Sequence, residues 1–100
     1  MPDTPAYNPE MVALAPVLDA AAAHALRDTL LEAVSLRADV VLDGAGVERI
    51  GTPAVQVLLA AGRALAAGSR RLVLAKPSRA LSGAFEDLGL SVELRSWSEG

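Results

Sequence analysis

The 100-residue sequence contains no cysteine, and no apolar run in it is long enough to cross a membrane. Without cysteine, the chain has no disulfide, no thiolate metal ligand and no cysteine nucleophile. A membrane span needs about 18 uninterrupted apolar residues, and charged residues break every apolar stretch here. The first residues also lack the basic and apolar regions of a signal peptide. These absences predict a soluble, cytoplasmic protein without direct membrane insertion.

Aromatic residues are scarce, since Tyr7, Phe85 and Trp97 are the only ones in the chain. Hydrophobic residues nevertheless make up 52% of the sequence. The core must therefore be built from Leu, Val and Ala. Burying one Leu or Val side chain stabilises a fold by roughly 1.5–3 kcal/mol, so these residues carry most of the stability.

Basic residues are also few, with nine Lys and Arg against twelve Asp and Glu and a formal net charge of −3. They are scattered, and Arg70-Arg71 is the only adjacent pair. A nucleic-acid-binding surface needs a basic stripe that neutralises many phosphates. The sequence therefore predicts no nucleic-acid partner.

Common catalytic motifs are missing as well. The one histidine, His24, lies among alanines and has no His or Cys partner for a zinc ion. The sequence contains neither a Gly-x-Ser-x-Gly elbow nor a Gly-x-x-x-x-Gly-Lys phosphate loop. We therefore predict a protein that is not an enzyme and that has no cofactor and no metal site.

Short apolar runs alternate with amphipathic segments along the chain. The runs Val40–Leu42 and Leu72–Leu74 are continuously apolar, which is typical of parallel strands covered on both faces. Another short strand is predicted within residues 10–14 and a last edge strand at Val92–Leu94. Apolar residues at helical spacing predict helices over residues 20–36, 53–67 and 79–88. This order predicts an α/β domain with right-handed crossovers.

The ends of the chain differ in composition from its middle. Residues 1–9 hold three prolines and are expected to form a flexible leader. Residues 10–96 are expected to form the domain, and residues 97–100 a polar tail.

The second predicted helix has the clearest boundaries. Thr52 is expected to cap its start, and Pro53 to occupy the first helical position. Gly68 is expected to end the helix in a left-handed conformation. Capping alone would explain Thr52, but an exposed hydroxyl there is also a candidate phosphoacceptor. A phosphoryl group would add up to about −2 charge beside the positive helix end.

The residues around Thr52 resemble the central signature of the STAS domain family. They comprise the apolar strand Val40-Val41-Leu42-Asp43, a short loop, and then Val47-Glu48-Arg49-Ile50-Gly51-Thr52-Pro53 before an apolar helix. Val17-Leu18-Asp19 is similar to the family's entry into its first helix, and residues 76–90 to its last strand and helix. The resemblance implies an α/β, STAS-like fold. That fold has a short mixed or parallel sheet of four or five strands and three or four flanking helices.

The resemblance also implies a protein-binding regulator. In bacterial anti-sigma factor antagonists, a histidine-kinase-like anti-sigma factor phosphorylates a Ser or Thr at the position of Thr52 and is also the binding partner. Similar stand-alone STAS proteins are encoded beside chemotaxis genes. In STAS accessory subunits of lipid-transport ABC systems, a Thr at this place instead supports constitutive docking to the ATPase. The resemblance leaves both roles open.

Two residues depart from the family pattern, because Gly51 stands where Asp is usual and Pro53 where Ser or Gly is usual. Pro53 removes one backbone donor, which leaves chiefly the Ala54 and Val55 N–H groups to hold a phosphate. We expect the partner-binding surface to surround this helix start. Its predicted residues are Asp19, Glu48, Arg49, Gly51, Thr52, Pro53 and Gln56.

Overall fold

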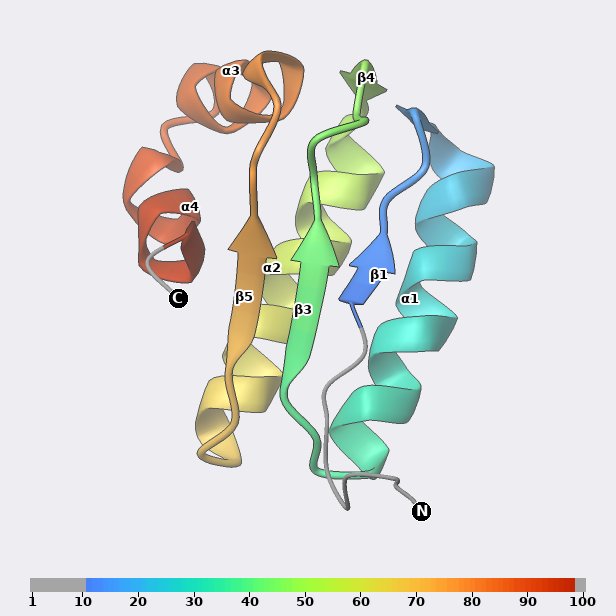
Figure 1. The fold of residues 1–100 in the computed structure, drawn as a ribbon, viewed down its shortest axis with the longest axis vertical. Helices are drawn as coiled ribbons and strands as arrows, with labels where there is room; N and C mark the ends of the chain where they lie inside the picture. Colours follow the sequence, from blue (N-terminus) through green and yellow to red (C-terminus); the bar gives the residue numbers. More distant parts are fainter. Residues whose placement is uncertain (1–10, 99–100) are drawn as a thin grey trace, which may run out of the picture.

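The structure, a computed structural model, describes residues 11–98 of the chain, so the predicted leader over residues 1–9 lies outside the described residues. Strands and helices follow one another along the described part of the chain (Figure 1). They are β1 (Met11–Ala13), β2 (Val17–Leu18), α1 (Ala20–Ser35), β3 (Val40–Asp43), β4 (Arg49–Ile50), α2 (Thr52–Ala67), β5 (Leu72–Ala75), α3 (Arg79–Asp87) and α4 (Ser91–Ser98).

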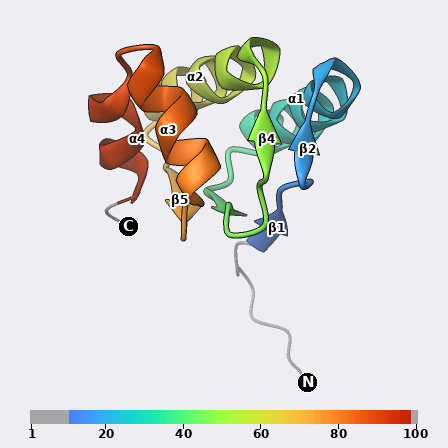
Figure 2. The same ribbon diagram turned by 90° about the horizontal axis from the view of Figure 1, so that it is seen from above.

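The main sheet has the order β1-β3-β5, and all of its pairs are parallel. A second ladder joins β2 to β4, also in parallel. Helices α1 and α2 lie side by side over one face of the main sheet, and α3 and α4 lie toward its β5 side (Figure 2). The predicted α/β class with parallel strands is thus confirmed.

The core lies between the main sheet and the layer formed by α1 and α2. Leu42 of β3 and Leu74 of β5 are fully buried, and they are register partners. Val41 and Val73 point to the opposite face and are only half-buried. The expectation that these strands are covered on both faces is therefore wrong for the part of the chain that the structure describes: helices cover one face (Figure 2).

Helix α2 ends at Ala67 as the sequence predicted, but the left-handed residue that follows it comes one position later than expected. Gly68 has a φ of −95°, and Ser69 instead takes the left-handed conformation with a φ of 61°. The Ser69 N–H donates to the Ala66 carbonyl at 3.0 Å, and the Arg70 N–H donates to the Leu65 carbonyl at 2.7 Å. These two bonds form a Schellman motif whose left-handed residue is Ser69. The prediction for Gly68 is therefore wrong.

The segment expected as a last edge strand at Val92–Leu94 is instead part of helix α4. Leu94 is 8% exposed and Val92 is 69% exposed, which fits one turn of a helix with a single buried side. Trp97 lies in the same helix, inside the range assigned to the tail. Its ring meets that of Phe85 edge-on at a centroid distance of 5.7 Å. This contact with buried Phe85 packs α4 against α3.

Candidate functional site

The short ladder between β2 and β4 brings the starts of α1 and α2 together. Val17 pairs with Arg49 and Leu18 with Ile50. Each strand leads directly into a helix, through Asp19 on one side and Gly51 on the other. The Gly51 N–H donates to the Leu18 carbonyl at 3.0 Å, which fixes the two helix starts side by side. The predicted site residues Asp19 and Gly51, which are distant in the sequence, thus lie near each other.

The two helices begin with different caps. Asp19 caps α1, because its side chain accepts from the Ala22 N–H at 2.9 Å. At α2 the cap residue is Gly51, in extended conformation, and Thr52 is the first helical residue. The prediction that Thr52 caps the helix is therefore wrong by one position. Because the Gly51 carbonyl accepts the first bonds of the helix, the Thr52 hydroxyl is not needed for capping.

Thr52 is exposed at the start of α2. Its hydroxyl has no hydrogen-bond partner among residues 11–98. It therefore projects toward solvent as an unused donor and acceptor. Both the phosphoacceptor role and the docking role expected of Thr52 require this accessibility.

The backbone donors that follow Thr52 are already occupied. The N–H groups of Ala54 and Val55 both donate to the Gly51 carbonyl, at 3.1 and 3.3 Å. Pro53 has no N–H to offer. The expected pair of donors for a phosphate therefore points into the helix start, and a phosphate on Thr52 would find little backbone support.

The predicted site residues all lie within four residues of the start of α1 or α2, and together we call them the helix-start surface. Glu48 and Arg49 are anchored through their N–H groups, which both donate to the Pro16 carbonyl at 2.7 and 3.1 Å. The side chains of the set are exposed, and Gly51 is half-buried. The members of the helix-start surface are Asp19, Glu48, Arg49, Gly51, Thr52, Pro53 and Gln56.

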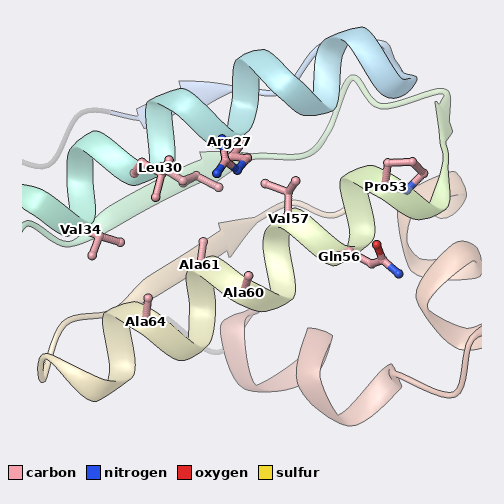
Figure 3. Close-up of a pocket in the computed structure, with 10 residues that line it drawn as sticks. Arg27, Leu30, Val34, Pro53, Gln56, Val57, Ala60, Ala61 and Ala64 are labelled. Carbon is pink, nitrogen blue, oxygen red and sulfur yellow. The ribbon is translucent and has the colours of Figure 1, made fainter.

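A groove that the sequence analysis did not anticipate continues from this surface between α1 and α2 (Figure 3). It has a volume of about 500 Å³. Pro53 and Gln56 lie at its end nearest the helix starts, and apolar side chains line most of its length. The sequence held one indication of this groove: Arg63 is the single charged residue among the 16 residues of α2.

Residues 11–98 contain neither a metal-binding cluster nor a membrane-spanning helix. No group of three or more His, Cys, Asp or Glu side chains in this range is placed to hold a metal ion. None of the helices in this range has the length and apolar character needed to cross a membrane. His24, the one histidine, is exposed on α1.

Comparison with known proteins adds one finding. A family model described as "Mlab, STAS domain" matches residues 6–96. No curated protein and no solved structure matches the chain. Because the family match extends over nearly the whole sequence, the protein belongs to the STAS domain family.

Proposed function

We propose that this protein is a non-enzymatic regulator that docks a partner protein on the helix-start surface, with Thr52 as a phosphoacceptor. STAS domains generally mediate protein–protein interactions. The proposed partner is a histidine-kinase-like anti-sigma factor, which would place the chain in a sigma-factor or chemotaxis signalling pathway. The observation that carries the proposal is the exposed Thr52 hydroxyl, which has no partner within residues 11–98.

The proposed switch works by charge. A phosphoryl group on Thr52 would place up to about −2 charge at the positive end of α2, where the helix tolerates it. A partner covering this end would bury that charge without a matching donor, because Ala54 and Val55 donate to Gly51. Phosphorylation would therefore release the partner while leaving the fold intact.

The same backbone geometry favours a second candidate function. With Gly51 in place of the usual Asp, and with no free donor on Pro53, the site offers little to hold a phosphate or orient the hydroxyl for transfer. The alternative is therefore a constitutive accessory subunit of a lipid-transport ABC ATPase. In that role Thr52 is a neutral contact residue that is never modified.

The first experiment finds the partner and tests the surface. The wild-type chain serves as bait in a pulldown, and mass spectrometry identifies the bound protein and the state of Thr52. Binding of the purified partner is then measured by calorimetry for Glu48→Lys and Gln56→Lys. We expect each variant to weaken binding about tenfold or more, a change of about 1.4 kcal/mol. Unchanged affinity for both variants would remove the helix-start surface from the proposal.

The second experiment separates the two functions. Under the phospho-switch, Thr52→Glu weakens the complex strongly whereas Thr52→Ala leaves it intact. Thr29→Glu is the matched control, because Thr29 is an exposed threonine on α1 outside the helix-start surface. Equal binding by Thr52→Glu and Thr52→Ala would rule out the switch. An ABC ATPase that co-purifies regardless of phosphatase treatment would establish the second function.

A further inference from the structure

The outward face of α2 is unusually poor in charge. A helix packed on one side of a sheet normally exposes charged or polar residues on its other side. In α2, the exposed positions include Ala60, Ala64 and Ala67, and Arg63 is the single charged residue of the helix. A helix that is apolar nearly all round is typical of one covered on both sides. This face is therefore suited to being buried.

The neighbouring helix presents an apolar side chain next to this face. Leu31 of α1 is 50% exposed although it lines the groove between α1 and α2. The α2 wall of the groove is lined by small residues, among them Ala60 and Ala64 (Figure 3). A large side chain beside a row of small ones forms a surface that can fit a copy of itself, as knobs fit into holes.

From these features we infer that the face formed by α1 and α2 binds a second copy of the chain. The two copies are related by a two-fold axis that lies in the interface, parallel to the helices. With this axis, α1 of each copy packs on α2 of the other. Leu31 of each copy then lies over the small side chains of Ala60 and Ala64 in the other copy. Their size lets the helices approach closely.

The charged side chains favour packing α1 on α2 over the alternative two-fold packing, in which α1 lies on α1. Figure 3 shows Arg27 and Val34 of α1 following one another in the same direction as Val57 and Ala64 of α2. Glu32 lies between the first two residues in the sequence and Arg63 between the last two, and both are exposed, so this packing brings Glu32 toward Arg63 of the second copy. Packing α1 antiparallel on α1 would instead bring Asp28 and Glu32 of both copies together. Like charges facing each other make that alternative unfavourable.

The size of the face predicts the strength of the dimer. Each 16-residue helix is ~24 Å long, and two adjacent helices are ~20 Å wide, which gives ~480 Å² per copy and ~960 Å² in total. Biological interfaces generally exceed about 1,000 Å². Arg27 also lines the groove close to the axis, so its two copies repel each other. We therefore expect a weak, reversible dimer.

Sedimentation velocity on the purified chain tests the inference, over protein concentrations from about 5 to about 500 µM. We expect the mass to rise from 10.3 kDa toward twice that value as the concentration increases. Ala60→Glu should raise the dissociation constant at least about tenfold, because it buries an unpaired charge. Ala66→Glu is the matched control, since Ala66 is exposed on the same helix but does not line the groove. Arg27→Leu should tighten the dimer.

Charge reversal tests the packing of α1 on α2. Glu32→Arg and Arg63→Glu should each weaken the dimer about threefold to tenfold, and the double variant should restore it. A mass of 10.3 kDa at every concentration would overturn the inference. Equal effects of Ala60→Glu and Ala66→Glu, or no restoration in the double variant, would overturn it as well. None of these measurements requires the partner protein of the proposed function.

Discussion

At the scale of single residues, Ser69 holds the conformation that glycine adopts most easily. It has a φ of 61° at the end of α2, while Gly68 beside it has a φ of −95° that any residue can adopt. The left-handed conformation costs a residue with a Cβ roughly 1–2 kcal/mol relative to the right-handed one. The glycine of this helix end is therefore one position away from where it would help most.

Exchanging residues at this turn should show which position carries the strain. Ser69→Gly should raise the free energy of unfolding by about 0.5 kcal/mol, because relief of strain outweighs the greater entropy of the unfolded chain. Gly68→Ala should be neutral or slightly stabilising, since a Cβ there meets its nearest atom, the Leu65 carbonyl oxygen, at an ordinary 3.7 Å. Urea unfolding measures both. A loss of more than about 1 kcal/mol in Gly68→Ala would show that Gly68 is the left-handed residue.

At the scale of elements, α2 and α4 pack together through a glycine. A Cβ added at Gly62 would lie 2.8 Å from Cζ2 of Trp97, so only glycine allows the indole ring to rest on α2 in this way. The same ring meets Phe85 of α3 edge-on. One side chain thus connects three helices.

Two glycines in helix interiors form a matched pair for testing this packing. Gly83→Ala should stabilise the protein by about 0.5–1 kcal/mol, because nothing lies within 4 Å of its added Cβ and alanine favours helix. Gly62→Ala gains the same propensity but displaces Trp97, and overpacking costs about 1–3 kcal/mol. We expect Gly62→Ala to be the less stable variant, with altered tryptophan fluorescence. Equal stabilisation by both changes would mean that Trp97 does not pack on Gly62.

The elements also show how far sequence reasoning reaches. The longer strands and first three helices follow from continuous apolar runs and helical periodicity, which are local properties. Strands β2 and β4 have two residues each, too few for any period, and only their mutual pairing defines them. The pattern at Val92–Leu94 fits a strand as well as a helix. Packing of Leu94 and Trp97 against the core decides for the helix, and this is a tertiary effect.

For the candidate site too, the sequence predicts some features and not others. The residues of the helix-start surface could be named from the sequence, because they follow apolar strands and precede helices. Their meeting depends on the bond from Gly51 to Leu18, which links distant parts of the chain. The groove could not be predicted, because its shape depends on how α1 lies against α2. The lack of charge in α2 was the available clue.

At the scale of the whole molecule, one core joins the sheet to all four helices of the described chain. Leu30 of α1, Leu58 of α2, Phe85 of α3 and Leu94 of α4 belong to the same buried cluster. Trp97 packs against this cluster. The short last helix is therefore tied into the same core as the longer ones.

This shared core predicts a single cooperative unfolding transition. Fluorescence of Trp97 and helical circular dichroism should give superimposable urea curves, because α4 cannot leave without exposing Phe85. The measurement is made at a protein concentration low enough to keep the chain monomeric. A fluorescence transition at lower urea than the dichroism transition would show that α4 unfolds first.

The parallel ladder between β2 and β4 joins the starts of α1 and α2 through backbone hydrogen bonds. Gly51 is bonded to Leu18, and Leu18 directly precedes the Asp19 cap. A partner that displaces the start of either helix therefore acts on the hydrogen bond between Gly51 and Leu18, and through it on the start of the other helix.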